Sequence, residues 1–253
     1  MLEIKNLKVS VDNKVILNDF NLKIEDGQIC AIMGPNGVGK STLSRVILGD
    51  KNYQILNGSI RYNNQRIDQM STDERARLGI FLAMQYPNTI EGVSNQDFLK
   101  TAMESNLNRH IGLYEFILEC EKNLKELKMD PSLIHRNLND GFSGGEKKKN
   151  EVLQMKLLNP SLIILDEIDS GLDVDSMKIV FTNIKKYLEE HPKTSLLIIS
   201  HYPMLFDYLK PDTVNILSQG KIIKTSNYSL AKDIFENGYN KYIKALNDED
   251  KNE

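Results

Sequence analysis

The sequence predicts an α/β fold in which helices cover both faces of a largely parallel β-sheet. Two observations support this prediction. Short and almost wholly apolar runs recur at Gln28–Met33, Leu162–Leu165 and Ser195–Ser200, as expected for strands that are buried on both faces of such a sheet. Segments with helical periodicity separate these runs, and an alternation of buried strands and helices is typical of the α/β class.

The N-terminal part of the chain is expected to form a hairpin, a buried strand and a helix. Leu2–Val11 and Val15–Ile24 alternate apolar and polar residues on either side of Asp12-Asn13, which predicts two antiparallel strands and a turn. The buried strand Gln28–Met33 follows, and a glycine-rich loop leads from it into a helix that ends at Gly49.

The remaining elements follow from the same patterns. Further strands are expected at Gly58–Tyr62, Gly79–Met84, Leu162–Leu165, Ser195–Ser200 and in a Val214–Lys224 hairpin with a Gln219-Gly220 turn. Helices are expected at Ser71–Leu78, in a polar insertion over Ser94–Met129, from the glycine stretch at 141 to Leu158, at Asp175–Glu190 and at Leu230–Phe235, before a charged tail.

Composition excludes several classes of protein. The 253 residues are 40% hydrophobic and 26% charged, which is ordinary for a globular domain, and a net charge of −3 argues against a general nucleic-acid binder. Cys30 and Cys120 are far apart in apolar segments, so we expect buried, inert thiols and no disulfide scaffold or metal cluster held by this chain alone. No apolar run approaches the roughly 18–20 residues of a membrane span. We expect a cytoplasmic protein, or one of a plastid or apicoplast stroma if a presequence was removed.

A phosphate-binding loop lies between the buried strand and the first helix. G-P-N-G-V-G-K-S at residues 34–41 matches G-x-x-x-x-G-K-[ST] in the strand–loop–helix context that the motif requires. Its backbone N–H groups and the helix N-terminus would bind phosphate oxygens, Lys40 would neutralise the β- and γ-phosphates, and the Ser41 hydroxyl would ligate Mg²⁺. The expected ATP contacts in this loop are Gly34, Pro35, Asn36, Gly37, Val38, Gly39, Lys40, Ser41 and Thr42.

A second apolar strand, Leu162–Leu165, ends in two carboxylates. Asp166 suits Mg²⁺ binding in the outer coordination sphere, and Glu167 is placed to act as the general base for the attacking water. The combination with the P-loop predicts nucleotide hydrolysis.

These motifs resemble, in order and spacing, those of an ATP-binding-cassette (ABC) nucleotide-binding domain. The resemblance rests on G-P-N-G-V-G-K-S, Gln85 at a strand end, F-S-G-G-E at 142–146, L-I-I-L-D-E at 162–167, S-G-L-D at 170–173, and His201 after an apolar strand. It implies a P-loop RecA-like core with an antiparallel β subdomain and a helical subdomain. A single domain would span 1–253, with the core and β subdomain in 1–85 and 160–253 and the helical subdomain in 86–159.

The resemblance also implies roles for particular residues. Gln85 would contact Mg²⁺ and report nucleotide occupancy to the helical insertion, and His201 would contact the γ-phosphate. Asp173 resembles the aspartate of the D-loop. Val11 lies near the place where many cassettes have an aromatic residue that stacks on adenine, and no Tyr or Phe replaces it there.

The glycine stretch Gly141–Lys149 is where the family has its signature motif. Ser143 is followed three residues later by Glu146, which predicts a capping box at a helix N-terminus. Ser143, Gly144, Gly145 and Glu146 would face the γ-phosphate bound by a second copy of the chain. The three lysines that follow fan around the helix, so most are expected in solvent. The sharper hypothesis is that one of them pairs with a catalytic carboxylate before the two copies close.

One branch of the family is especially similar. Q-Y-P-N-T-I-E-G-V-S-N at 85–95, G-F-S-G-G-E-K-K-K-N-E-V-L-Q-M at 141–155 and D-E-I-D-S-G-L-D at 166–173 resemble the Suf-type ATPases of iron–sulfur cluster assembly. The implied partners are SufB-like and SufD-like scaffold proteins, docked near Gln85–Asn95 and the following helices, and a transient head-to-tail homodimer with ATP. Ile168 departs from the expected Ser or Thr. One alternative is the ATPase subunit of a membrane ABC transporter. The other is a non-catalytic ATP-dependent interaction module, and Glu167 argues against this second alternative because it is the expected general base.

Overall fold

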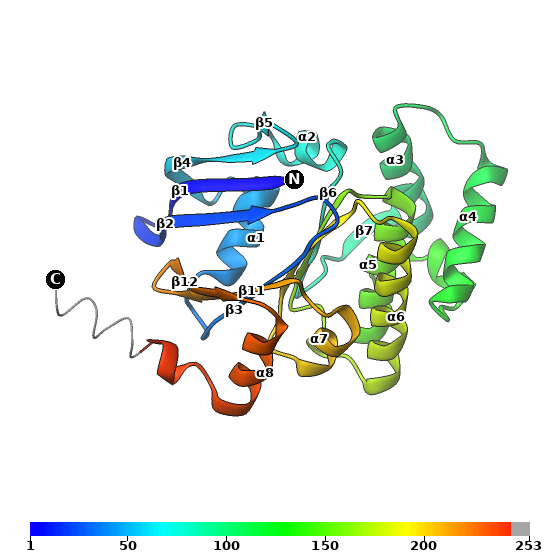
Figure 1. The fold of residues 1–253 in the computed structure, drawn as a ribbon. Coiled ribbons are helices and arrows are strands. Elements are labelled where there is room, and N and C mark those ends of the chain that lie inside the picture. The colour runs from blue at the N-terminus through cyan, green and yellow to red at the C-terminus, as the bar shows by residue number, and fades with distance from the viewer. Residues whose placement is uncertain (244–253) are drawn as a thin grey trace, which may run out of the picture.

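The computed structural model describes residues 1–243, and the charged tail expected after them lies outside the described residues. Its central sheet has the strand order β12-β11-β3-β10-β9-β6 (Figure 1). Five neighbouring strands are parallel: β3 (Ile29–Met33), β6 (Ile80–Ala83), β9 (Leu162–Asp166), β10 (Ser195–Ile199) and β11 (Thr213–Ser218). The edge strand β12 (Lys221–Ser226) runs antiparallel. The predicted α/β class is therefore confirmed.

A second, antiparallel sheet has the order β2-β1-β4-β5. It is formed by β1 (Leu2–Val11), β2 (Lys14–Ile24), β4 (Gln54–Tyr62) and β5 (Gln65–Arg66). Asp12 and Asn13 connect the first two strands with φ of 48° and 62°, the left-handed values that a tight hairpin turn requires. Strand β4 begins four residues before the predicted start at Gly58. That glycine lies inside the strand at φ 90°, where it faces an irregularity in the pairing with β1.

Helix α1 (Lys40–Leu48) packs into the apolar core between the two sheets. Leu43, Val46 and Ile47 are its buried apolar residues. Gly49 ends the helix, as predicted, and adopts the left-handed conformation. The short helix α2 (Thr72–Arg77) begins with a capping box from Ser71 to Glu74. Because α1 starts directly after the P-loop, this packing holds the loop at the end of β3.

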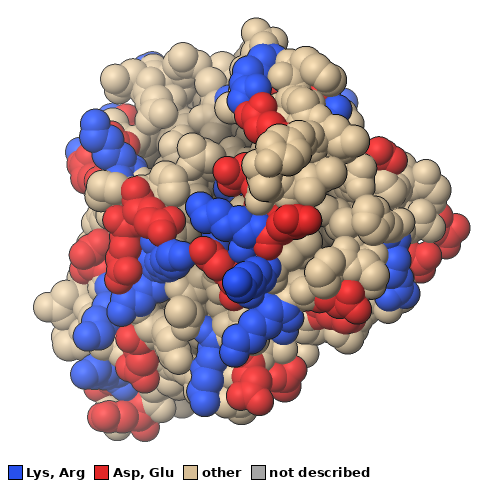
Figure 2. Space-filling view, turned by 90° about the vertical axis from the view of Figure 1, so that its right-hand side faces the viewer, with Lys and Arg blue, Asp and Glu red and all other residues tan. Residues whose placement is uncertain are grey.

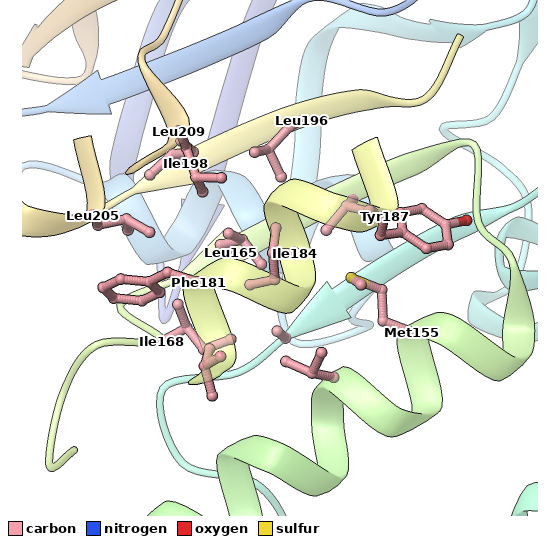
Figure 3. Packing of buried hydrophobic residues seen from close by; sticks show 14 of the residues in the cluster. Met155, Leu165, Ile168, Phe181, Ile184, Tyr187, Leu196, Ile198, Leu205 and Leu209 are labelled. Carbon is pink, nitrogen blue, oxygen red and sulfur yellow. The ribbon is translucent and has the colours of Figure 1, made fainter. Parts of the chain in front are cut away.

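The other face of the central sheet is covered by α5 (Gly144–Leu158), α6 (Val174–Glu190), α7 (Pro203–Leu209) and α8 (Tyr228–Asn237). In Figure 3, Ile184 of α6 lies beside Leu165 of β9, and Phe181 of the same helix lies near Leu205 of α7 and Ile168. Helix α7 was not predicted, because it has only seven residues, and its first residue, Pro203, reads as a breaker although it suits a helix start.

The polar insertion forms a separate layer of helices, seen on the right of Figure 1. It contains α3 (Asn95–Leu107), α4 (Leu113–Glu126) and a 3-10 turn at Pro131–His135. A short ribbon of β7 (Ile90–Ser94) and β8 (Asn137–Leu138) closes it, and this ribbon was not predicted. None of the helices in residues 1–243 is both long enough and apolar enough to cross a membrane.

Buried amides connect this layer to α5. Asn95 Nδ2 donates to Asn150 Oδ1 at 2.8 Å, and Asn150 Nδ2 donates to Asn139 Oδ1 at 3.0 Å. Asn139 Nδ2 in turn donates to the carbonyl of Asn88 at 2.7 Å. Asn95, Asn150 and Asn139 are at most 3% exposed, so their hydrogen bonds offset a desolvation cost that water cannot relieve.

An ion-pair cluster joins three helices on the helical side of the molecule. Glu126 at the end of α4 accepts hydrogen bonds from Lys156 of α5 and, at 2.7 Å, from Lys186 of α6. These lysines lower the pKa of Glu126 to about 2. Figure 2 shows charges of both signs interspersed over this side of the molecule.

We expect Glu126→Gln to lower the free energy of unfolding by about 1 kcal/mol at pH 7, because the cluster is partly exposed and screened. A carboxylate with a lowered pKa stabilises the fold above its unfolded pKa and loses that contribution as the pH falls. The difference from wild type should therefore shrink between about pH 4.5 and pH 2. Urea unfolding at several pH values measures this difference in the free energy of unfolding. Glu190→Gln is the control, since this exposed residue is 3.8 Å from Lys186; an equal loss in both variants would contradict the prediction.

Candidate functional site

The P-loop curls around the ammonium group of Lys40. This side chain is only 5% exposed, and its Nζ donates to the carbonyls of Gly34 and Pro35 at 2.9 Å each. Gly37 and Gly39 have φ of 81° and 106°, a region that favours glycine. Burial lowers the pKa of Lys40, and the nearby Glu167 and Asp166 partly offset this effect. The loop thus holds a cation inside a ring of backbone groups.

Asp166 ties the end of β9 to the first turns of α1. Its buried carboxylate accepts hydrogen bonds from Ser41 Oγ at 3.2 Å and from Ser44 Oγ at 2.6 Å. Ser44 was not among the predicted site residues. Its position three residues after Ser41, on the same helix face, was the available signal. The contacts bring the hydroxyl and carboxylate oxygens of Ser41 and Asp166 together.

Glu167 leaves β9 with a left-handed backbone, at φ 49°. Such a conformation costs a residue other than glycine about 1–2 kcal/mol, and here the Glu167 N–H donates to the carbonyl of Ile199 at 2.8 Å. Oε2 accepts a hydrogen bond from Gln85 Nε2 at 2.6 Å, and Oε1 is 3.7 Å from Nε2 of His201. Burial raises the pKa of Glu167, Asp166 and Asp169 raise it further, and Lys40 and Gln85 lower it.

A groove of about 400 Å³, here called the P-loop groove, brings these residues together. Asn36, Gly37, Gly39, Lys40, Ser41, Thr42, Gln85 and Glu167 line it, together with Val11, Ile16 and Tyr53. Tyr53, in the loop between α1 and β4, is the aromatic residue among those that line this groove. A ring there is suited to stack on a nucleotide base. Sequence reasoning missed Tyr53 because it follows the P-loop instead of preceding it.

The signature stretch lies outside the P-loop groove. Ser143 and Glu146 form the predicted capping box, since Ser143 Oγ accepts from the Glu146 N–H at 3.2 Å and Glu146 Oε2 from the Ser143 N–H at 2.7 Å. In the part of the chain that the structure describes, none of the residues 143–146 lines the P-loop groove. Gly145 instead lies against the start of α6, where an added Cβ would be 2.8 Å from Ser176 Oγ. Asp173 caps that helix by accepting from the Ser176 N–H at 2.8 Å.

The position of Lys148 differs from two predictions about the three lysines, namely that most lie in solvent and that one pairs with a catalytic carboxylate. It is 3% exposed instead of solvated, and Lys147 and Lys149 are half-buried. Its Nζ donates to the carbonyls of Met84 and Gln85, and its ion pair goes to Glu151 at 3.4 Å and not to the Glu167 carboxylate. Glu151 also accepts from the Met84 N–H at 2.8 Å. Burial lowers the pKa of Lys148 and raises that of Glu151 to about 7.

This arrangement clamps one backbone segment between two side chains of α5. Both polar groups of Met84 and the carbonyl of Gln85 are held by Lys148 and Glu151. Since the Gln85 side chain contacts Glu167, the helix that begins with the signature stretch is connected to the carboxylate in the P-loop groove.

Three further expectations concern buried side chains. Ile168, which replaces an expected Ser or Thr, is fully buried in the core beside α6 (Figure 3). Cys30 and Cys120 are buried free thiols, as predicted, and burial raises their pKa to about 11 and about 12. Neither is a reactive thiolate at neutral pH.

The fold and the P-loop groove define an ATP-binding cassette. The family model described as ABC transporter matches residues 17–170, from β2 to just beyond β9. The chain therefore belongs to the ABC transporter family and is an ATP-hydrolysing enzyme. Among solved structures, the dimeric post-hydrolysis state of the cassette MJ0796 bound to ADP and Pi has a TM-score of 0.78. It is 20% identical and covers 90% of this chain and 99% of its own, a likeness that shows the fold.

Proteins with similar sequences indicate which branch of the ABC family the chain resembles. A probable ATP-dependent transporter, ycf16, of Cyanophora paradoxa is 47% identical over 94% of this chain and 93% of its own length. Vegetative protein 296 of Bacillus subtilis is 44% identical over 98% and 95% of the two chains. The probable ATP-dependent transporter SufC of Escherichia coli K12 is 43% identical over 94% and 97%. The chain is a SufC-like ABC ATPase.

Proposed function

We propose that the chain is the ATP-hydrolysing subunit of a Suf-type iron–sulfur cluster assembly machinery, in which it drives conformational change in a SufB–SufD-type scaffold. The observation that carries this proposal is the contact of Gln85 with Glu167 at 2.6 Å. It links the segment expected to dock on a partner with the carboxylate expected to activate water. The chain has only two cysteines, both buried, so the cluster itself would be held by the scaffold.

The hydrolysis step assigns a role to each residue of the P-loop groove. Glu167 accepts a proton from a water whose oxygen attacks the γ-phosphorus, and the bond from that phosphorus to the bridging oxygen of ADP breaks. Lys40 neutralises the phosphate oxygens, and Gln85 orients Glu167. His201 lies on the other side of that carboxylate and contacts the γ-phosphate.

Ser41, Gln85 and Asp166 are the residues that would hold Mg²⁺. They supply a hydroxyl, an amide oxygen and a carboxylate, the oxygen donors that this ion prefers. The hydrogen bond from Ser41 to Asp166 at 3.2 Å brings two of these donors together. When bound, Mg²⁺ supplies charge neutralisation at the β- and γ-phosphates.

A second copy of the chain completes the site in this proposal. Ser143–Glu146 lie outside the P-loop groove of their own chain, so they serve the γ-phosphate held by Lys40 of another copy, head to tail. A lone chain is then expected to hydrolyse ATP weakly, and its specific activity rises with protein concentration.

Mixing two inactive variants tests this arrangement. Ser143→Arg blocks the signature contact, and Lys40→Ala disables the P-loop. A mixed dimer has one intact composite site, so an equimolar mixture should exceed either variant alone and reach at most about a quarter of wild-type activity. Phosphate release measures it. No gain on mixing, or turnover independent of concentration, would contradict the composite site.

The partner would dock on an apolar groove along α3, here called the docking groove. Val93, Asp97, Phe98, Thr101, Ala102 and Ser105 line a hollow of about 350 Å³. It continues, through Phe98, Ala102 and Ser105, into a hollow of about 240 Å³ between α2, β6 and α3. Tyr86, in the segment expected to dock on a partner, is 75% exposed. In this proposal residues 86–159 form a helical subdomain that moves on a core of 1–85 and 160–253.

A pull-down from native extract, with and without ATP, tests the identity of the partner. Co-purification of soluble SufB-like and SufD-like proteins supports the proposal. The substitution Val93→Asp in the docking groove should reduce the amount of these proteins that co-purifies. Leu56→Asp on β4, at a residue 52% exposed, is the control. Integral membrane subunits would support the second candidate, the ATPase of a membrane transporter. The description of the relatives ycf16 and SufC as probable ATP-dependent transporters favours this candidate. We propose a cytoplasmic location, with a plastid or apicoplast stroma as the alternative.

A further inference from the structure

The ring of His201 is held between two groups of opposite character. It follows β10, and its Nδ1 is 3.3 Å from the hydroxyl of Tyr239. Its Nε2 is buried without a hydrogen-bond partner among the described residues and lies 3.7 Å from Oε1 of Glu167. A buried polar atom without a partner is rare in a folded protein, and a catalytic role is one of its explanations.

These contacts decide which ring nitrogen carries the proton. Burial and the charge of Lys40 lower the pKa of His201, and Asp169 offsets this only in part, so the ring is neutral and has one N–H. A lone pair on Nε2 would face the carboxylate of Glu167 and be repelled, whereas an N–H there is attracted. The proton therefore belongs on Nε2, and Nδ1 must accept a hydrogen bond.

Tyr239 is placed to donate that hydrogen bond. It follows α8 after Gly238 and packs against the main core. Burial raises the pKa of Tyr239, and the backbone of Gly34 lowers it in part. The raised pKa keeps the phenol protonated at neutral pH, so its proton is available for Nδ1 of His201.

We propose that Tyr239 is a positioning residue for ATP hydrolysis: its hydroxyl donates to Nδ1 of His201 and so keeps the proton on Nε2, directed at Glu167 and at the γ-phosphate. The effect on hydrolysis rests on the proposed role of His201, whereas the contact between the two side chains does not. Tyr239, which follows α8, thereby helps to position a side chain of the site.

The first experiment reads the tautomer directly. In the full chain without nucleotide, ¹⁵N NMR of the histidine ring should show His201 as the Nε2–H tautomer. Tyr239→Phe removes only the hydroxyl and should shift the ¹⁵N pattern towards a mixture of tautomers. Tyr228→Phe is the control, since its hydroxyl donates to Asp207 at 2.5 Å and not to His201. An unchanged His201 pattern in Tyr239→Phe would overturn the proposal.

The second experiment measures kinetics. Tyr239→Phe should lower kcat for ATP hydrolysis by about three- to tenfold, the effect of one lost hydrogen bond, with KM unchanged and no change in Tyr228→Phe. In a His201→Ala background Tyr239→Phe should have no further effect. An equal loss in both backgrounds would overturn the proposal. A shifted tautomer with unchanged kcat would leave the positioning of His201 in place and overturn its catalytic role instead.

Discussion

Glu167→Gln is expected to reduce ATP hydrolysis by about 10²- to 10⁴-fold while ATP binding is retained. The amide keeps the shape of the carboxylate but cannot take a proton from water. The left-handed backbone and the hydrogen bond from the Glu167 N–H to Ile199 do not depend on the charge, so the fold should be unchanged. Phosphate release measures hydrolysis, and calorimetric titration with ATP measures binding.

The control for this variant is Glu189→Gln, an exposed glutamate of α6 that should hydrolyse ATP like wild type. The pH dependence provides a second check. Because the pKa of Glu167 is raised above its ordinary value of 4.5, the rate should still be increasing with pH above pH 4.5, as the base ionises. Retained hydrolysis in Glu167→Gln would show that another group accepts the proton.

Lys148→Met is expected to destabilise the chain by about 3–5 kcal/mol, although it removes a single charge. The substitution leaves the Glu151 carboxylate and two carbonyls buried with no cation beside them. The free energy of unfolding, from urea denaturation, measures the loss. Lys147→Met is the matched control: its side chain is half-buried in the same helix turn, and it should change stability by less than about 0.5 kcal/mol.

A double variant separates the charge from the packing. Lys148→Met with Glu151→Leu replaces the buried pair by two apolar side chains, and such replacements are often neutral. We expect it to regain most of the stability, but not all, since the Met84 N–H loses its acceptor. A double variant no more stable than Lys148→Met would show that shape, and not the unpaired carboxylate, causes the loss.

The features that could be predicted from the sequence depend on neighbouring residues. The P-loop, the capping box from Ser143 to Glu146 and the two carboxylates at the end of β9 are each encoded within a few residues. The turn at Asp12-Asn13 and the helix end at Gly49 are equally local. These elements were placed correctly, with errors confined to their ends, as for β4.

The features that could not be predicted depend on contacts between distant segments. Lys148 looked like a surface lysine, because nothing near it in the sequence reveals the carbonyls of Met84 and Gln85 that it meets. Tyr53 and Tyr239 are unremarkable aromatic residues until the fold brings them to the P-loop groove and to His201. The ribbon of β7 and β8 joins segments more than forty residues apart, and its short, mostly exposed strands carry no apolar alternation.

The buried amides of Asn95, Asn139 and Asn150 restrict how the layer of helices can move relative to α5. Each of these amides is hydrogen-bonded in the arrangement of α3, α5 and the loop at Asn88 that the structure shows. Deforming that arrangement leaves buried donors and acceptors without hydrogen-bond partners, and each such group costs about 1–3 kcal/mol of free energy. This cost favours movement of α3, α5 and the loop at Asn88 as one unit.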